Sequence, residues 1–578
     1  MMSDKIFRVN MGDHSVKIED VPTEWQGLGG RALTSAIVAA EVPPTCDPLG
    51  KRNKLVFAPG LLSGTRAANS GRLSAGAKSP LTGGIKECNS GGNAAQLLAR
   101  LGIKALIVEG VPTESQFYAL KVNAEGVVIT SENDLVGNGN FEVIEKLGIS
   151  KNKSCGLLSI GQAGERLQLS ANISVKDPEG KIRSLGRGGL GAVMGSKGVK
   201  YILIDAAEAP KSIALVDEEK FKVAAKTFAK ALLDHPVCGS ALGAYGTNVL
   251  VNIVNEVGGL PTRNFRTGQY DQHEMISGEK MAELIETRGG KVKHGCHAGC
   301  VMQCSQVYVD KEGNYVTSGF EYETIWAMGA HCCIDDLDIL AQADGIMDDI
   351  GVDSIEMSVT VGVAMEAGVI DFGDGAGLLK LLQEVKDGTP LGRILGSGAG
   401  VTGKVYGLTR VPVVKNQAIP AYDPRSVKGI GITYCTSTMG ADHTAGYTVA
   451  TNILKCGGFI DPLQKEGQVE LSRNLQIATA AIDSTGLCLF VAFAVLDDAT
   501  ALPAVVDMLN ARFGISLTVD DVTALGTSVL KTEHAFNLAA GLTNAHDRLP
   551  EFFVDEKVAP HGAVWDFSDE EIDEFWNF

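Results

Sequence analysis

The sequence predicts an α+β protein in which an N-terminal β-sheet platform precedes two mostly α-helical domains. The chain has 578 residues, enough for about three or four structural units. Hydrophobic residues make up 45% of it and charged residues 21%, which is the balance of a folded globular protein. Near Val216 the spacing of apolar residues changes from short runs between turns to helical periodicity.

The platform is predicted over residues 1–207. Its apolar runs are short and lie between clusters of Gly, Pro and Asn, as strands do; examples are Lys54–Phe57, Ala105–Val108 and Tyr201–Ile204. The chain contains 69 Gly residues, and Gly allows the backbone to approach a bound group closely. We therefore expect a sheet whose long loops surround something bound. No internal repeat is visible in the sequence.

Helical periodicity dominates the rest of the chain. It predicts helices over residues 218–233, 278–287, 335–349, 355–367, 469–482 and 502–513. The Gly-rich stretch 396–403 and the Pro-bearing loop 419–424 indicate a boundary near residue 410, which divides this part into domains 208–410 and 411–578. The tail, residues 568–578, is interpreted as a solvated helix held by aromatic residues, in preference to a strap that docks on a partner.

Charge and apolar runs exclude several classes of protein. The 51 basic and 69 acidic residues give a net charge of −18, which repels nucleic acid and anionic lipid. The longest apolar run, Gly486–Leu496, is far short of the roughly 20 residues that span a bilayer, so no membrane span is expected. Residues 1–10 carry charges and no apolar secretion segment. The twelve cysteines therefore indicate a cytoplasmic chain whose reduced thiols pack or bind metal.

The densest chemical cluster is His294–Cys304, which contains Cys296, Cys300 and Cys304 at intervals of four residues. Thiolates are soft ligands, and at this spacing they suit an iron–sulfur cluster or zinc. A metal site is favoured over thiols that meet by chance, and structural zinc is the second interpretation. A four-thiolate cluster needs one more ligand, for which Cys488 is the candidate. The other cysteines are interpreted as core thiols.

Two similar loops, Asp348–Asp353 and Asp483–Cys488, both read D-x-x-G-[LV]-[DC]. Each puts a carboxylate at a turn beside a Gly, which suits it to accept hydrogen bonds from the NH groups of a heterocycle. The plain alternative for each loop is a capped helix end. Their similarity predicts a pseudo-symmetric ligand.

The Gly-rich stretch Gly186–Lys197 is not a nucleotide-hydrolysing P-loop. Ser196 precedes Lys197, where a Walker A loop needs Gly-Lys-Ser/Thr. Successive Gly amides can still point at an anion, so the stretch is predicted to hold a phosphate. Arg72 is expected to add charge to the same site.

Together these motifs resemble the tungsten-dependent aldehyde:ferredoxin oxidoreductase family over essentially the whole chain. The resemblance rests on motifs in the family's order: Gly29–Leu33, Ser79–Gly84, Gly189–Lys197, Glu321–Thr324, the cysteine trio and both D-x-x-G loops. It implies a sheet-built N-terminal domain under two mostly helical domains. It also implies a tungsten held by two pterin dithiolenes at the junction of these domains.

The resemblance assigns cofactor ligands residue by residue. It implies a [4Fe-4S] cluster on Cys296, Cys300, Cys304 and Cys488, and a Mg²⁺ that bridges the pterin phosphates and is held by the carbonyls of Asn89 and Leu185. The residues implied to hold the pterins and their phosphates are Arg72, Asn89, Leu185, Gly186, Arg187, Asp348, Gly351, Val352, Asp353, Asp483, Gly486, Leu487 and Cys488. Arg72 or Cys488 is also placed to link the tungsten cofactor to the cluster.

Two features depart from the family pattern. Three residues separate Cys296 from Cys300, where the family usually has two. The chain also contains no E-x-x-H, the motif with which some members bind an iron at a dimer interface. The oligomeric state therefore stays open, as an oligomer or a complex with other subunits.

Aldehyde oxidation adds oxygen and removes a hydride equivalent while water is deprotonated. It requires a high-valent metal, a base and a donor to the carbonyl oxygen. The resemblance implies Glu323 as the base and His443 as the donor. Glu321 is the alternative base, because the Glu-Tyr-Glu spacing puts both glutamates near one site. The sequence does not distinguish tungsten from molybdenum.

The leading interpretation is a cytoplasmic enzyme that oxidises aldehydes and passes electrons singly through the cluster. The acceptor is a ferredoxin or a dedicated iron–sulfur or flavin subunit, and the acidic net charge favours the subunit over an acidic ferredoxin. One alternative is the catalytic subunit of an aryl-CoA reductase of the benzoyl-CoA type. Another is an electron-relay subunit that has a cluster but no pterin catalysis.

Overall fold

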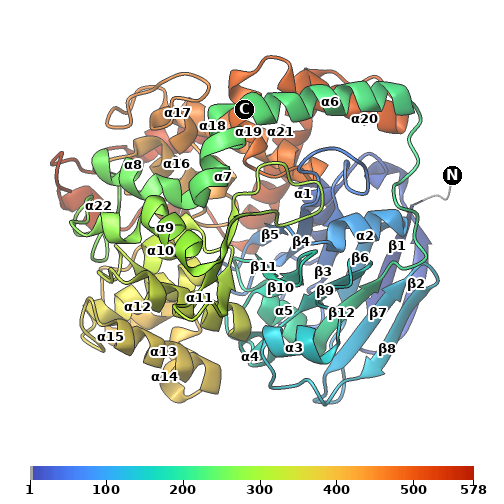
Figure 1. The fold of residues 1–578 in the computed structure, drawn as a ribbon, viewed down its shortest axis with the longest axis horizontal. Helices are drawn as coiled ribbons and strands as arrows, with labels where there is room; N and C mark the ends of the chain where they lie inside the picture. Colours follow the sequence, from blue (N-terminus) through green and yellow to red (C-terminus); the bar gives the residue numbers. More distant parts are fainter. Residues whose placement is uncertain (1–3) are drawn as a thin grey trace.

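The structure is a computed structural model that describes residues 4–578 and has the α+β architecture predicted from the sequence. The strands of the platform lie on one side of the molecule, coloured blue to teal, and helices coloured green to red lie beside and above them (Figure 1). Of the charged amino-terminal segment 1–10, the part from Lys5 to Asn10 forms strand β1. Residues 1–3 lie outside the described part of the chain.

The platform consists of two six-stranded sheets. The first has the order β2-β1-β6-β3-β4-β5. Its strands are β1 (Lys5–Asn10), β2 (Ser15–Asp20), β3 (Leu55–Pro59), β4 (Leu73–Lys78), β5 (Ile85–Ser90) and β6 (Ile103–Glu109). The second has the order β8-β7-β12-β9-β10-β11. Its strands are β7 (Tyr118–Asn123), β8 (Gly126–Ser131), β9 (Cys155–Ser159), β10 (Ile173–Lys176), β11 (Ile182–Leu185) and β12 (Val199–Asp205).

The two sheets are copies of one topology. Adding six to each strand number in the order of the first sheet gives the order of the second sheet. The strand orientations also repeat: β1 pairs antiparallel with β2 and parallel with β6, and β7 pairs antiparallel with β8 and parallel with β12. No repeat is visible in the sequence, so the prediction that the chain lacks an internal repeat is wrong for the fold of the platform. Strands pair through their backbones, so the pairing can be repeated while the side chains diverge. The innermost strands β5 and β11 contact each other.

Five helices accompany the platform strands, and one of them follows the Gly-rich stretch. They are α1 (Gly30–Glu41), α2 (Ala94–Arg100), α3 (Asn140–Lys146), α4 (Gln162–Glu165) and α5 (Leu190–Ser196). Helices α2 and α5 are equivalent in the duplication, since each follows the innermost strand of its sheet. Both therefore begin near the middle of the molecule, where the two sheets meet.

The middle of the chain is mostly helical and also contains a three-stranded sheet. The helices are α6 (Glu218–Asp234), α7 (Leu242–Tyr245), α8 (Leu250–Glu256), α9 (Gly278–Arg288), α10 (Tyr322–Met328), α11 (Leu337–Ile350), α12 (Ser354–Glu366), α13 (Gly375–Asp387), α14 (Pro390–Leu395) and α15 (Ala399–Tyr406). The strands are β13 (Lys291–His294), β14 (Ser305–Val309) and β15 (Tyr315–Ser318).

The last part begins with a short hairpin and continues with helices. The hairpin strands are β16 (Val413–Val414) and β17 (Gln417–Ala418). The helices are α16 (Lys428–Thr436), α17 (Val449–Asn452), α18 (Gln468–Thr485), α19 (Val491–Asp497), α20 (Ala501–Phe513), α21 (Val519–Ala540), α22 (Phe552–Asp555) and α23 (Asp569–Asp573).

The predicted strands and helices are confirmed. The three predicted strands are β3, β6 and β12, and the six predicted helices are α6, α9, α11, α12, α18 and α20. The Gly-rich stretch 396–403, one of the two signs of a boundary near residue 410, includes the start of helix α15. Its glycines serve close packing, because a Cβ on Gly400 would lie 1.9 Å from Asn416 and one on Gly403 would lie 2.3 Å from Val411.

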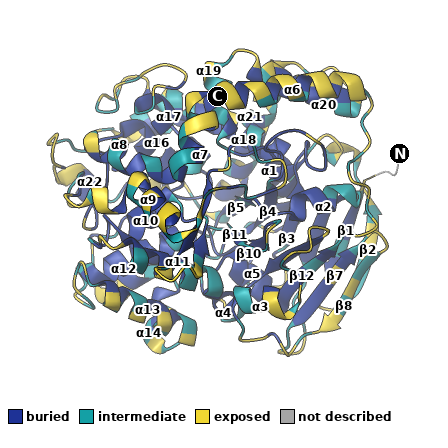
Figure 2. Ribbon diagram, in the orientation of Figure 1, coloured by how far each residue is buried: buried dark blue, intermediate teal, exposed yellow. Residues whose placement is uncertain are grey.

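Burial follows the layers (Figure 2). The sheets are buried where they meet the helices, while the outward faces of α6 and of the β7–β8 edge are exposed. The tail is held as expected: Phe575 is buried and Trp576 stacks on His534 with ring centroids 3.7 Å apart. Residues Pro236–Glu256 are long and apolar enough to cross a membrane by composition, with a mean hydropathy of 1.3. They are divided into short helical pieces, and Gly246 among them has a φ of 64°.

Candidate functional site

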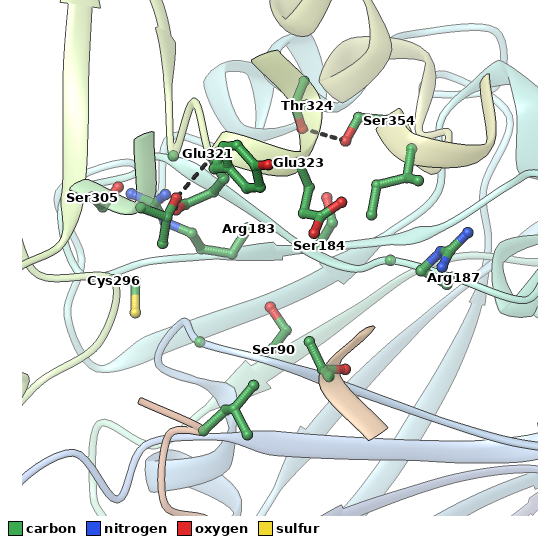
Figure 3. Close-up of a pocket in the computed structure, with 18 of the residues that line it drawn as sticks. Ser90, Arg183, Ser184, Arg187, Cys296, Ser305, Glu321, Glu323, Thr324 and Ser354 are labelled. Atoms are coloured by element: carbon green, nitrogen blue, oxygen red, sulfur yellow. Dashed lines mark hydrogen bonds between the residues drawn. The ribbon is translucent and has the colours of Figure 1, made fainter. Parts of the chain in front are cut away.

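A cavity of about 320 Å³ lies where the platform meets the helices. Figure 3 shows Glu321 and Glu323 in its upper part, at the start of α10, and Ser90 in its lower part, at the end of β5. Arg183 and Arg187 line it from the second sheet, so both halves of the platform contribute walls. The predicted site residues that line it are Arg72, Gly186, Arg187, Cys296, Cys304, Glu321, Glu323, Asp348, Val352, Asp353, His443 and Cys488.

The cysteines predicted to bind metal lie together at one end of this cavity. Cys296 and Cys300 come from the loop between β13 and β14, where their sulfur atoms and a ring nitrogen of His297 lie within 4.8 Å of one another. Cys304 and Cys488 share the cavity wall with Cys296, although they come from distant parts of the chain. This set of soft ligands suits an iron–sulfur cluster.

The four thiols differ in their electrostatics: burial raises the pKa of Cys304 well above its usual value and that of Cys488 to about 11, and a hydrogen bond with Cys296 raises that of Cys300. A hydrogen bond with Cys300 lowers the pKa of Cys296 well below its usual value, against the effect of burial. Burial disfavours the charge of Arg72, but the nearby thiol groups of Cys488, Cys296 and Cys304 raise the pKa of its guanidinium. Arg72 therefore lines the cavity near these cysteines, in agreement with a link between cofactor and cluster as the resemblance implies.

The two D-x-x-G loops are helix ends that dock on equivalent parts of the platform. Helices α11 and α18 end at Gly351 and Gly486, whose φ angles of 73° and 81° suit Gly. The backbone N–H of Asn172 donates to the Gly351 carbonyl at 2.9 Å, and that of Arg72 donates to the Gly486 carbonyl at 3.0 Å. Asn172 and Arg72 precede the equivalent strands β10 and β4. The two loops are therefore related by the same duplication as the sheets.

Close backbone contact fixes both loops. A Cβ on Gly60 would lie 2.0 Å from the nitrogen of Gly486, and one on Gly161 would lie 2.4 Å from the carbonyl oxygen of Ile350. Only Gly fits at these two platform positions without displacing a loop. The backbone N–H of Cys488 also donates to the Asn69 carbonyl at 2.9 Å, which brings this thiol from α18 to the platform.

The carboxylates of the two loops differ in their surroundings. Asp348 lines the cavity, and burial together with neighbouring Asp344 raises its pKa well above its usual value. Asp483 lies behind the wall, 3.3 Å from Arg31, and accepts a hydrogen bond from Asn89 at 3.0 Å. Burial raises the pKa of Asp483 to about 6. The cavity thus receives the carboxylate of the first loop directly, whereas that of the second loop is already paired.

The Gly-rich stretch contributes backbone and a guanidinium. Gly186 faces open space, since a Cβ there would meet nothing within 4 Å. Arg187 is buried and contacts three segments of the chain. Its Nε lies 3.0 Å from Asp353, its Nη1 donates to the Ala441 carbonyl at 2.7 Å, and its Nη2 donates to the Ala418 carbonyl at 2.7 Å. Lys197 lies away from the cavity and donates to the Asn53 carbonyl, as expected if the stretch is not a P-loop.

The remaining predicted ligands lie outside the cavity wall. Leu185 ends β11 with its side chain in the platform core, and Asn89 lies near the end of β5. The Asn89 carbonyl accepts from Arg72 Nη2 at 2.9 Å. Gly351, Gly486, Leu487 and Cys300 are likewise adjacent to the wall and do not line it.

Glu323 and His443 face each other across one side of the cavity. His443 Nε2 lies 3.3 Å from Glu323 Oε1, and Glu323 Oε2 accepts the backbone N–H of Ala421 at 3.0 Å. Burial raises the pKa of Glu323 to about 8 and lowers that of His443 to about 4. At pH 7 both groups are therefore mainly uncharged, so this contact is not an ion pair.

Glu321 belongs to the other side of the cavity. It accepts a hydrogen bond from Thr247 at 2.6 Å and lies near Arg183 and Cys296. Burial raises its pKa to about 7. Both glutamates line one cavity, as the sequence predicts. Their partners differ, because Glu321 precedes α10 and Glu323 lies in its first turn.

Several cavity residues were missed by sequence reasoning. Arg183 is buried, forms an ion pair with Asp177 at 3.2 Å and lines the cavity. The hydroxyls of Tyr422 and Tyr447 are hydrogen-bonded to each other at 2.7 Å, and both rings lie beside His443. Strand β11 contains the polar residues Arg183 and Ser184 between Ile182 and Leu185, so the sequence gave little signal for Arg183. The tyrosines come from separate loops and gave none.

Comparison with known proteins agrees over nearly the whole chain. The model of the aldehyde ferredoxin oxidoreductase N-terminal domain matches residues 6–206, and that of domains 2 and 3 matches residues 223–578. The tungsten-containing aldehyde ferredoxin oxidoreductases of Pyrococcus furiosus and Thermococcus kodakarensis are 34% and 35% identical to this chain. Each alignment covers 96% of this chain and 92% of the relative. A more distant relative, the WOR-like subunit of an aliphatic sulfonate oxidoreductase from Pyrococcus furiosus, is 24% identical over 89% of this chain and 82% of its own.

A solved structure shares the fold. The active-site complex BamBC of benzoyl coenzyme A reductase with 1,5-dienoyl-CoA superposes with a TM-score of 0.80, over 99% of this chain and 93% of that one. At 18% identity this match concerns the fold alone. Taken with the two family models and the relatives at about 35% identity, it leads to one conclusion: the chain belongs to the aldehyde ferredoxin oxidoreductase family.

Proposed function

We propose that this protein oxidises aldehydes to carboxylic acids with a tungsten bis-pterin in the cavity and a [4Fe-4S] cluster on Cys296, Cys300, Cys304 and Cys488. The observation that carries the proposal is the Glu323–His443 pair, which faces the same cavity as three of these thiols. Reduction of a viologen dye by the purified holoprotein with an aldehyde tests it. The absence of reduction with every aldehyde would contradict it.

The cavity residues fit such a cofactor. Six lining side chains have a buried polar atom without a hydrogen-bond partner in residues 4–578: Ser90, Asn172, Arg183, Ser305, Glu323 and His443. Buried polar atoms are normally paired, so these atoms indicate a large polar ligand. Arg72, Arg187 and the Gly186 backbone would hold phosphates, and Asp348 would accept from pterin NH groups. When bound, the metal would accept the two electrons that the aldehyde loses.

The side chains of this protein supply the proton chemistry. The reaction converts RCHO and H₂O into RCOOH, two protons and two electrons, so a water proton must be removed. Glu323 Oε1, which has no hydrogen-bond partner within the described chain, is placed to take that proton. The neutral imidazole of His443 has one N–H, which donates to the carbonyl oxygen as charge develops there.

The pKa of Glu323 predicts the pH dependence of the reaction. The base must be the carboxylate, and burial raises its pKa to about 8. Below this value most molecules are protonated, so kcat/KM should rise roughly tenfold per pH unit and level off above about pH 8. His443 stays neutral over this range, since burial lowers its pKa to about 4. A kcat/KM profile from pH 5 to 10 tests this, and a rate that falls between pH 6 and 8 would contradict it.

Two segments without acidic residues meet at the thiol loop of this acidic protein, beside the Lys291–Glu179 ion pair of 2.8 Å. No acidic residue occurs between Glu286 and Asp310, nor between Asp47 and Glu87, and these two segments pack together where the Asn69 N–H donates to the Gly299 carbonyl at 3.0 Å. Gly299 and Gln303 are exposed beside the cysteines. We propose that an acidic ferredoxin docks here. The net charge of −18 favours a dedicated electron-transfer subunit over an acidic ferredoxin, but these two segments do not share that acidic composition.

Charge reversal in these two segments should weaken the docking of ferredoxin. Arg66 and Lys293 are exposed and form no ion pair within residues 4–578. Changing both to Glu should raise the KM for an acidic ferredoxin about tenfold at low salt and leave the rate with a small viologen dye unchanged. Lys557→Glu, an exposed lysine on another part of the surface, is the matched control. A KM equal to that of the control would contradict docking at these segments.

We also propose a cytoplasmic location, a Mg²⁺ site and three domains. All twelve cysteines are free thiols, which supports a reducing, cytoplasmic environment. The Mg²⁺ on the Asn89 and Leu185 carbonyls and the domain limits 1–207, 208–410 and 411–578 are proposed on the family resemblance and sequence pattern. The aryl-CoA alternative is tested with an aryl-CoA and the reduced form of the dye, because reduction of the aromatic ring would oxidise the dye.

A further inference from the structure

A second, smaller cavity adjoins the candidate active site. It has a volume of about 40 Å³ and lies between helices α18 and α19. Tyr447 and Leu489 line it and also line the large cavity, so they form a wall common to both. Among its lining residues Ala478 is exposed and Ala492 is half-buried, so the small cavity is an apolar groove that reaches the surface.

The groove is lined almost entirely by hydrocarbon. Among its lining residues only Thr479 and Tyr447 have a polar side-chain atom, and none is ionisable in the physiological range. The Tyr447 hydroxyl is already bonded to that of Tyr422 at 2.7 Å. The arginines that line the large cavity, Arg72, Arg183 and Arg187, by contrast, all come from the platform. The groove therefore suits an uncharged chain and disfavours a phosphate, a sulfonate or a CoA moiety.

The common wall connects the groove to the proposed chemistry. The Tyr447 ring lies 6.1 Å from the His443 ring and 6.1 Å from the Phe493 ring of α19, measured between centroids. Leu489 is half-buried in the turn that precedes α19, where no helix constrains it. Tyr447 and Leu489 are thus the two side chains that the groove shares with the cavity of Glu323 and His443.

We propose that the α18–α19 groove binds the hydrocarbon tail of a linear aliphatic aldehyde, with Tyr447 and Leu489 as the gate between tail and reacting carbonyl. This inference rests on the proposed function and names its substrate class. Each methylene that leaves water for the groove should raise kcat/KM about fourfold, until the groove is filled. Hexanal should therefore be a much better substrate than acetaldehyde.

Filling the groove tests the proposal. Ala492→Phe blocks its interior and Ala478→Phe its exposed mouth, and each should lower kcat/KM for hexanal at least about tenfold while acetaldehyde stays within about twofold. Ala535→Phe, at an exposed alanine of α21 outside the groove, is the control. If wild-type kcat/KM does not depend on chain length, or if both variants lower hexanal and acetaldehyde equally, the groove is not the tail site. Ala478→Phe keeps the test valid if Ala492→Phe fails to fold.

A binding measurement separates this inference from the proposed function. Hexanoate, the product of hexanal, should raise the melting temperature of the purified protein more than acetate does. Ala492→Phe should remove that difference. If no aldehyde is oxidised but the hexanoate effect is present and is lost in the variant, the groove still binds an apolar chain and only the proposed function fails. Equal effects of hexanoate and acetate on the wild type would overturn the inference.

Discussion

Glu323→Gln is expected to lower kcat for aldehyde oxidation by about 10² to 10⁴, the usual contribution of a general base. Gln has the same size and keeps an oxygen that can accept the Ala421 N–H, a bond of 3.0 Å in the wild type. The amide cannot take a proton, so the loss should appear in kcat at unchanged tungsten content. The variant should also lose the rise in kcat/KM toward about pH 8.

Glu321→Gln is the matched control for this variant. Glu321 is a buried glutamate two residues away, but it is bonded to Thr247 and faces the cysteines. It should therefore keep most of the turnover and the wild-type pH profile. His443→Ala should lower kcat over the same range as Glu323→Gln. Wild-type turnover in Glu323→Gln, or a larger loss in Glu321→Gln, would show that the base is assigned to the wrong residue.

Cys488→Ala is expected to remove the absorbance and EPR signal of the iron–sulfur cluster and to abolish electron transfer to ferredoxin. Cys488 is the proposed ligand from the second D-x-x-G loop, and a cube with three thiolates is incomplete. The fold should persist, because the backbone N–H of residue 488 still donates to the Asn69 carbonyl. Circular dichroism and iron analysis of the purified variant check both expectations.

Cys332→Ala is the control for this variant. Cys332 is a fully buried thiol whose Sγ donates to the Ala327 carbonyl at 3.2 Å, in agreement with its interpretation as a core thiol. The same chemical change there should leave iron content and the EPR signal at the wild-type level. An unchanged cluster signal in Cys488→Ala would remove this residue from the ligand set.

The sequence predicted those parts of the site that depend on local pattern. The spacing of Cys296, Cys300 and Cys304 puts three thiols in one short loop whatever the surroundings, and this loop does lie at the cavity. The D-x-x-G pattern is a helix end closed by a left-handed Gly, so its geometry follows from Gly351 and Gly486 themselves. The interpretation of these loops as capped helix ends and their interpretation as ligand-binding loops are therefore compatible.

Other features depend on contacts that a single sequence does not contain. The duplication of the platform is carried by backbone pairing, and its clearest signs are two hydrogen bonds, from Arg72 to Gly486 and from Asn172 to Gly351. The different pairing of Asp348 and Asp483 depends on Arg31, which lies 452 residues from Asp483 in the chain. Such pairs form only when the fold is complete, so periodicity and composition give no indication of them.

The two glutamates show how an element boundary decides a role. On a strand, residues two apart share one face, whereas on a helix they point in widely different directions. The sequence left open whether Glu321 and Glu323 lie on a strand or at a helix start. Helix α10 begins at Tyr322, between them, so the two carboxylates diverge.

The central claim is that this chain uses a tungsten pterin cofactor beside Glu323 and His443 to oxidise aldehydes. Metal and pterin analysis of the purified protein by mass spectrometry, with dye reduction by a panel of aldehydes on the same sample, tests it most directly. The account predicts about one tungsten, two pterins and four irons per chain, together with aldehyde-dependent reduction. About four irons without tungsten or pterin, and no response to any aldehyde, would contradict it and indicate an electron-relay subunit.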